Sequence, residues 1–153
     1  MVFTVYSSRL TIKIRMMKTI QEQQDDIVNE FSLFEDWMDK YAYLIELGTA
    51  MEALDERHKT EDNLIKGCQS RVWLYAEKRE GLVFFFADSD AIITKGIAAL
   101  LARVFSGQTP QAISDAPLDF IDRIGLTRHL SPTRSNGLLS MVKQIKYYAL
   151  AYL

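Results

Sequence analysis

The chain has 153 residues, of which 48% are hydrophobic and 25% are charged, and its net charge is −2. This composition is typical of one globular domain and leaves too little chain for two. Lys95 and Arg103 interrupt the longest apolar stretch, residues 91–105, so the sequence predicts no membrane-spanning helix. The single cysteine, Cys68, excludes an internal disulfide, and no Cys/His cluster has metal-ligand spacing. We therefore expect a reducing compartment, the cytoplasm.

Charge is distributed unevenly along the chain. Residues 21–62 hold 13 acidic and 3 basic residues, whereas residues 66–153 hold 11 basic and 7 acidic residues. Solvated helix faces would produce this separation, and so would a polarised surface that orients a protein partner. The basic residues form neither a strongly basic stripe nor an aromatic platform, so nucleic-acid binding is not expected.

Residues 1–16 form an extension that contains Ser, Lys and Arg but no acidic residue. Two interpretations stay open, a short organelle transit peptide and translated upstream sequence, because Met16-Met17-Lys18 offers a second start. We predict that the extension is disordered and that the folded domain comprises residues 17–153.

Two helices are predicted in the acidic part of the chain. Thr19 and Glu22 have the spacing of a capping box that opens the first helix. The second begins within residues 32–36, carries an aromatic stripe that is expected to be core, and is expected to end at Gly48. Residues 49–66 are polar and predict a long connection with one helical turn.

A β-hairpin is predicted next. Residues 72–76 and 82–87 are rich in β-branched and aromatic residues, and the polar residues 77–81 join them. The second strand is apolar almost throughout, so we expect helices to cover one of its faces and the loop of Cys68 the other. Residues 63–67 are a further candidate for a strand.

The next apolar run, residues 91–105, predicts a mostly buried helix that ends at Gly107. Ser89 or Asp90 is suited to its N-cap, because either side chain can accept a hydrogen bond from a free amide. Two short helices are then predicted within residues 109–124, each opened by a proline in its first turn.

A turn at residues 129–137 is predicted to lead into the terminal helix, whose apolar stripe should pack on the sheet. Lys143 and Lys146 are expected to face water. His129 is equally suited to pinning the turn and to chemistry. Arg134 is equally suited to holding carbonyl or carboxylate oxygens and to meeting a partner.

The sequence around Cys68 is the main candidate for a functional site. Gly67 permits backbone conformations that other residues avoid, and Gln69 and Ser70 supply hydrogen-bonding groups. The flanking basic residues, which would favour the thiolate, are Lys66 and Arg71. A lone cysteine is also a common buried hydrophobe, so a reactive loop thiol and a structural Cys68 both stay open.

Three stretches together resemble the SufE family, whose members activate cysteine desulfurases in iron–sulfur cluster assembly. They are residues 67–74 (GCQSRVWL), residues 87–96 (ADSDAIITKG) and residues 125–138 (GLTRHLSPTRSNGL). The resemblance extends over residues 18–153. It implies an α+β fold, a small curved antiparallel sheet flanked by helices, of the SufE/IscU-like kind.

The resemblance also implies a function. Cys68 would take persulfide sulfur from a SufS-like, pyridoxal-phosphate-bearing cysteine desulfurase, stimulate that enzyme, and pass the sulfur to a SufB-like Fe–S scaffold. The chain would be a persulfide carrier without a cofactor or metal of its own, and not an enzyme. One thiol without a resolving cysteine fits such a relay better than a disulfide switch. In SufE-like proteins the acceptor loop is sheltered at rest and swings out on docking.

Further residues are expected to support the loop or the partner surface. They are Gly67, Gln69, Ser70, Asp90, His129 and Arg134. Two alternatives stay open. The chain could be a non-catalytic interaction module of the same fold with a structural Cys68, or a hydrolase in which Cys68 is the nucleophile and His58 or His129 the base.

Overall fold

The computed structural model describes residues 18–153, and the predicted extension, residues 1–16, lies outside the described residues. In chain order the elements are α2 (Ile20–Phe31), α3 (Trp37–Ala50), η1 (Glu56–His58), η2 (Glu61–Asn63), β1 (Val72–Arg79), β2 (Leu82–Ser89), α4 (Ile92–Phe105), α5 (Pro110–Asp115), α6 (Phe120–Arg123), η3 (Leu126–His129) and α7 (Pro132–Ala151). Strands β1 and β2 pair antiparallel, which confirms the predicted α+β class.

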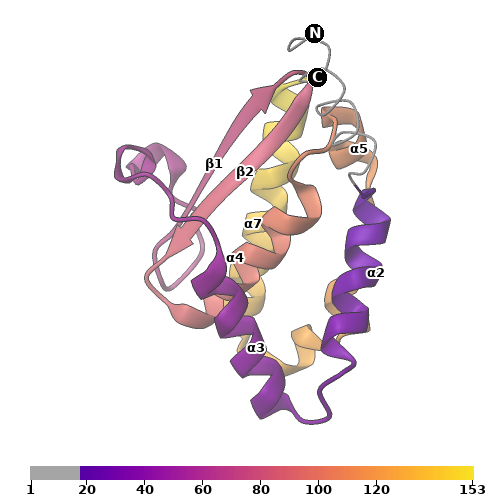
Figure 1. The fold of residues 1–153 in the computed structure, drawn as a ribbon. Coiled ribbons are helices and arrows are strands. Elements are labelled where there is room, and N and C mark those ends of the chain that lie inside the picture. Colours follow the sequence, from indigo (N-terminus) through magenta and orange to yellow (C-terminus); the bar gives the residue numbers. More distant parts are fainter. Residues whose placement is uncertain (1–17) are drawn as a thin grey trace, which may run out of the picture.

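Helix α4 is the central element of the fold. It contacts β2 as well as α2, α3 and α7, and Figure 1 shows it in the middle of the molecule. Its sequence explains this position, because a helix that is apolar on nearly all sides must be covered on all of them. Gly107 follows the end of the helix with a φ of 76°, as expected of a glycine that terminates a helix.

The hairpin is longer than predicted. β1 extends to Arg79 and β2 begins at Leu82, so part of the predicted turn belongs to a strand. Glu80 and Gly81, with φ values of 50° and 82°, form the remaining two-residue turn, which matches the twist of the strands. The third candidate strand is reduced to an isolated bridge between Leu64 and Trp73.

The two faces of the hairpin are covered by different parts of the chain. The inward face alternates with the strand period and is buried, and its residues are Val72, Leu74, Ala76, Val83, Phe85 and Ala87. On the outward face His58 stacks on Tyr75 with ring centroids 3.7 Å apart, and the Lys59 ammonium lies 5.7 Å from the ring centroid of Trp73. The prediction that the Cys68 loop covers this face is therefore wrong, because the segment around η1 occupies it.

Helices α3 and α4 cross at two glycines. A Cβ on Gly96 would lie 2.3 Å from the carbonyl oxygen of Leu44, and a Cβ on Gly48 would lie 2.8 Å from the backbone nitrogen of Gly96. Gly48 does not end α3, which continues to Ala50. Its missing side chain serves the close approach of two helix backbones instead of a helix end.

Helix α7 begins earlier than predicted, at Pro132, with the Ser131 hydroxyl accepting a hydrogen bond from the Arg134 N–H at 3.3 Å. Leu138, Met141, Ile145 and Ala149 of its apolar stripe are buried. The Tyr148 hydroxyl donates to the Leu74 carbonyl of β1 at 3.2 Å, as expected of a stripe that packs on the sheet. Lys143 is exposed, but the prediction for Lys146 is wrong. The Lys146 ammonium donates to the carbonyl oxygens that end α5, including that of Ala116 at 2.6 Å, because the last carbonyls of a helix need donors.

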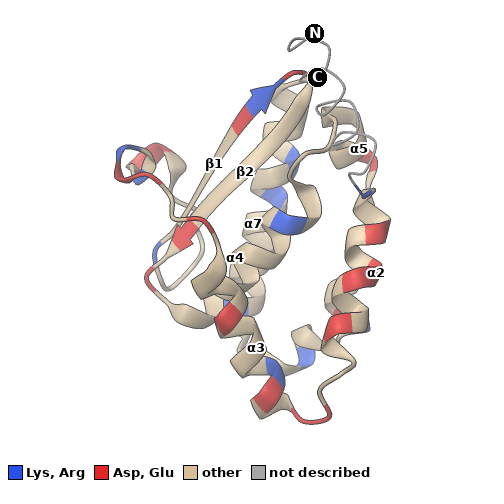
Figure 2. Cartoon of the chain, in the orientation of Figure 1, with Lys and Arg blue, Asp and Glu red and all other residues tan. Residues whose placement is uncertain are grey.

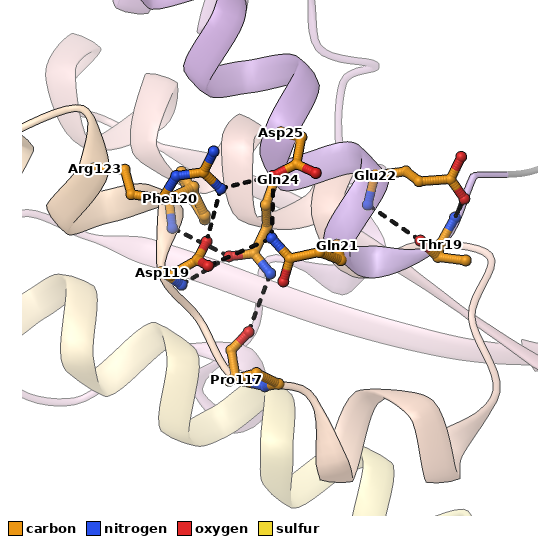
Figure 3. A network of polar contacts seen from close by, with 9 residues as sticks. All are labelled: Thr19, Gln21, Glu22, Gln24, Asp25, Pro117, Asp119, Phe120 and Arg123. Carbon is orange, nitrogen blue, oxygen red and sulfur yellow. Dashed lines mark hydrogen bonds and ion pairs between the residues drawn. The ribbon is translucent and has the colours of Figure 1, made fainter.

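Helix α2 is held at both its start and its middle. The Thr19 and Glu22 side chains each accept a hydrogen bond from the other's backbone N–H, as the capping-box pattern predicted. The amide of Gln24, which is fully buried, donates to the Pro117 carbonyl at 3.0 Å and accepts from the backbone N–H of Asp119 at 2.8 Å (Figure 3). Gln24 thus fixes α2 to the chain that enters α6.

The predicted separation of charge follows these elements. Helix α2 contains no basic residue, whereas α4 and α7 contain no acidic one (Figure 2). Among the helices of residues 18–153, none combines the length and the apolar character that crossing a bilayer requires.

Candidate functional site

Cys68 lies in the loop between η2 and β1 and packs against α7. A Cβ on Gly137 of α7 would lie 2.9 Å from the Cys68 Sγ, so the thiol rests on bare helix backbone. Gly67 precedes it with a φ of 91°, a conformation that favours glycine. Cys68 is half-buried in this position. Helix α7 therefore shelters one side of the thiol.

The three sequence motifs meet around the thiol. They line a cavity of about 150 Å³. Its lining residues are Cys68, Gln69 and Ser70 from the first motif, Ala91 and Thr94 from the second, and Thr133, Arg134 and Gly137 from the third. Stretches that are far apart in sequence thus form one small site, and the predicted site residues Gln69, Ser70 and Arg134 all belong to it.

Asp90 holds the loop at its far end and does not cap α4. Its Oδ1 accepts a hydrogen bond from the Arg71 N–H at 3.0 Å, and its own N–H donates to the Arg71 carbonyl at 3.2 Å. The Ser89 hydroxyl donates to the same carbonyl at 2.8 Å. The N-cap of α4 is Ala91 and not, as was predicted, Ser89 or Asp90, although the Ser89 hydroxyl accepts a hydrogen bond from the Ala91 N–H at 3.2 Å. Their polar groups fix the point where the Cys68 loop enters β1.

Burial raises the pKa of the Cys68 thiol. Desolvation penalises the charged form of a group, and for a thiol that form is the thiolate. The flanking Lys66 and Arg71 side chains are exposed and do not offset this effect. The expectation that they favour a thiolate is therefore wrong for the loop as it rests here. The resting site holds a neutral thiol.

The two histidines lie elsewhere. His129 stacks on Trp37 with ring centroids 3.7 Å apart, its Nδ1 lies 3.0 Å from the Gly125 carbonyl oxygen, and its own carbonyl accepts from the Tyr41 hydroxyl. His129 therefore pins the chain before α7. Of the described residues, the cavity lining includes neither His129 nor His58. The hydrolase alternative thus lacks its base beside Cys68.

Four lining residues are not among the predicted site residues, namely Ala91, Thr94, Thr133 and Gly137. Thr94 is the single hydroxyl-bearing residue of α4, and that contrast could have singled it out. Gly137 was placed in a turn, although it lies inside α7. Residues 18–153 bring no three His, Cys, Asp or Glu side chains together in an arrangement that could hold a metal ion.

Comparisons with known proteins point to one family. The family model of SufE, described as the Fe-S metabolism associated domain, matches residues 25–149. An uncharacterized SufE-like protein of Rhizobium meliloti (strain 1021) is 39% identical over 128 residues, which cover 80% of this chain and 91% of the relative. An uncharacterized SufE-like protein of Rhizobium etli is 40% identical over 128 residues, which cover 80% of this chain and 86% of the relative.

A solved structure has the same fold. It is the solution structure of a hypothetical protein from Thermus thermophilus, with a TM-score of 0.71. The two chains are 19% identical in sequence, and the match covers 85% of this chain and 95% of the other. The likeness supports the arrangement of helices around the hairpin.

Proposed function

Because the chain belongs to the SufE family of Fe–S metabolism associated domains, we propose that it carries sulfane sulfur on Cys68. The sulfur comes from a SufS-like cysteine desulfurase, whose turnover the chain stimulates, and goes to a SufB-like scaffold for cluster assembly. The observation that carries the proposal is the position of Cys68, the single cysteine of the chain, in a cavity that all three family motifs line.

The transfer is a thiol exchange that needs no oxidant. The Cys68 thiolate attacks the outer sulfur of the donor's persulfide, so that a new S–S bond forms on Cys68 while the donor's S–S bond breaks. The donor cysteine leaves as a thiolate, and the proton of the Cys68 thiol passes to solvent or to the donor's site. An acceptor thiolate repeats the exchange and restores Cys68. Pyridoxal phosphate belongs to the donor enzyme, where it releases the sulfur of free cysteine.

The neutral resting thiol implies that the loop moves during transfer. The raised pKa of Cys68 disfavours the nucleophilic thiolate while the loop rests on α7. Docking of the desulfurase then lifts the loop, exposes the thiol and removes the desolvation that keeps it neutral. Between transfers the same shelter limits reaction of the carried sulfur with reductants. A reducing, cytoplasmic setting belongs to this proposal, because the carrier thiol must be regenerated free of disulfides.

Intact-protein mass tests the proposal. The chain and Cys68→Ser are mixed separately with a cysteine desulfurase, pyridoxal phosphate and cysteine. We expect the wild type to gain one sulfur atom, about 32 Da, that reduction removes, and the variant to gain none. No gain with several desulfurases, while the thiol still reacts with an alkylating probe, would refute the carrier function.

The close packing of Cys68 on Gly137 also suits a second candidate, an interaction module of the same fold in which the cysteine is structural. The two candidates differ in what Cys68→Ser does to the partner. A carrier variant still binds the desulfurase but no longer speeds its turnover, whereas a module keeps both properties. Measuring binding and desulfurase turnover with the same variant separates them.

A further inference from the structure

Two polar side chains are buried among the described residues, Gln24 at 0% and Thr94 at 7% exposed. The Gln24 amide is satisfied by backbone groups around α6. Thr94 differs, because within residues 18–153 its hydroxyl has one hydrogen-bond contact, a long one of 3.5 Å with the Ser70 hydroxyl. A hydroxyl carries one donor hydrogen in addition to its acceptor sites. The contact uses only one of the two hydroxyl hydrogens, so the other hydrogen of the Ser70–Thr94 pair is available to a further partner.

The partner has to come from the cavity that holds Cys68. Thr94 and Ser70 both line it, together with the thiol, and its volume of about 150 Å³ confines whatever the thiol carries. Thr94 reaches the cavity from the first turns of α4, a rigid and central helix. Ser70 reaches it from the loop of Cys68 itself. The hydroxyl pair thus spans the loop and the helix against which the loop closes.

We propose that the Thr94 hydroxyl, backed by Ser70, donates a hydrogen bond to the outer sulfur carried on Cys68 and stabilises the anionic form of that sulfur in the cavity. The inference rests on the proposed function for the identity of the cargo. A persulfide ionises more readily than a thiol, so the cargo is an anion in a place where the resting thiol is neutral. A hydrogen bond to the charged form of a group favours that form.

The contact between the two hydroxyls supports this role. Either hydroxyl can donate to the other, and the one that accepts is polarised, so that its own hydrogen becomes a better donor toward the cavity. The Ser70–Thr94 contact is long when Cys68 carries no sulfur. A sulfur anion that accepts a hydrogen bond from the pair would shorten this contact. The pair therefore has an additional hydrogen-bond acceptor only when Cys68 carries sulfur.

A purely structural Thr94 would behave differently on substitution. Valine has the same branched shape and preserves the packing of α4, so Thr94→Val removes the hydroxyl and little else. Replacing a buried hydroxyl by a methyl group of the same shape is nearly neutral for stability when no partner is left unpaired. A structural role therefore predicts no change in how the carried sulfur ionises.

The test loads the sulfur chemically, without a desulfurase. Inorganic polysulfide passes one sulfane sulfur to the Cys68 thiolate and is itself shortened by one sulfur, so no oxidant is required. After desalting, intact mass verifies the loading, and the rate of persulfide alkylation by iodoacetamide is followed against pH. The variants are Thr94→Val, Thr94→Ser, Ser70→Ala and, as a matched control, Thr49→Val on the exposed side of α3.

We expect the alkylation midpoint of Thr94→Val to rise by about one pH unit, because the anion loses a hydrogen bond. Ser70→Ala should raise it less, and Thr94→Ser and Thr49→Val should match the wild type. An unchanged midpoint in Thr94→Val would overturn the inference. If circular dichroism shows that Thr94→Val does not fold, Ser70→Ala becomes the deciding variant. A raised midpoint in Ser70→Ala then supports the inference, and an unchanged midpoint overturns it.

The outcomes also separate this inference from the proposed function. A wild-type chain that accepts sulfur from polysulfide but from no desulfurase contradicts the carrier function, while the midpoints still decide the role of Thr94. A folded wild-type chain that retains no sulfur from polysulfide overturns both.

Discussion

Gly137 of α7 faces the thiol of Cys68 so closely that a Cβ on the glycine would lie 2.9 Å from the Cys68 Sγ. Heavy atoms at that separation overlap, so the resting position of the thiol depends on the absence of one methyl group. The thiol is half-buried in this position, and burial raises its pKa. Gly137 therefore permits the position in which burial disfavours the thiolate of Cys68.

Gly137→Ala should therefore displace Cys68 from its shelter. The thiol is the end of a flexible loop side chain and can move, so we expect alkylation of Cys68 by iodoacetamide at fixed pH to become several-fold faster. The free energy of unfolding should change little. Alanine is about 0.5–1 kcal/mol more favourable than glycine inside a helix, and this gain offsets the cost of displacing Cys68. Asn136→Ala, at the exposed neighbouring position, is the control and should leave the rate unchanged. Equal rates in Gly137→Ala and wild type would show that α7 does not confine the thiol.

The raised pKa of Cys68 predicts two pH effects. Alkylation of the folded chain should have a higher pH midpoint than alkylation of the chain in urea. The folded state holds its thiol proton more tightly, so the associated stability is present below the unfolded pKa and is lost as pH rises through the folded pKa. In urea unfolding, the stability of Cys68→Ser should therefore fall less at alkaline pH than the stability of the wild type. Coincident alkylation midpoints in the folded and unfolded chains would contradict the effect.

Asp90→Ala should loosen the loop where it enters β1. The Arg71 N–H loses its acceptor on Asp90, so hydrogen exchange of the Arg71 amide should accelerate. Asp90→Asn keeps an oxygen that can accept and should have a smaller effect. Asp62→Ala, an exposed carboxylate in η2, is the control. If the Arg71 amide exchanges equally in all of them, the Ser89 hydroxyl and the strand pairing hold this end of the loop without Asp90.

Local signals in the sequence predicted much of this fold. The Thr19–Glu22 capping box, the hairpin and the buried helix are all encoded within a few residues of where they form. Gly48 and Lys146 were misjudged because their partners, an α4 backbone and the end of α5, are distant in sequence. From local sequence alone, a glycine is expected at a helix end and a lysine in water. Contacts with residues that are distant in sequence can override both expectations.

The candidate site divides in the same way. Motif order singled out Cys68, Ser70 and Arg134, and the structure gathers them in one cavity. The sequence could not show that burial would outweigh the flanking cations in setting the pKa of Cys68, since desolvation depends on the packing of α7. Thr94 could not be singled out in this way, because its partner Ser70 lies on another element.

Gln24→Ala should destabilise the fold far more than Gln23→Ala, although the two glutamines are neighbours on α2. Gln24 is fully buried, and its loss leaves the Pro117 carbonyl and the N–H groups of Asp119 and Phe120 without a partner (Figure 3). Unpaired buried groups of this kind cost about 1–3 kcal/mol each, partly relieved where water enters, so we expect a loss of about 2–4 kcal/mol in the free energy of unfolding. Gln23→Ala should stay within about 0.5 kcal/mol. Urea denaturation followed by circular dichroism measures both, and similar losses in the two variants would mean that Gln24 does not hold α6 to α2.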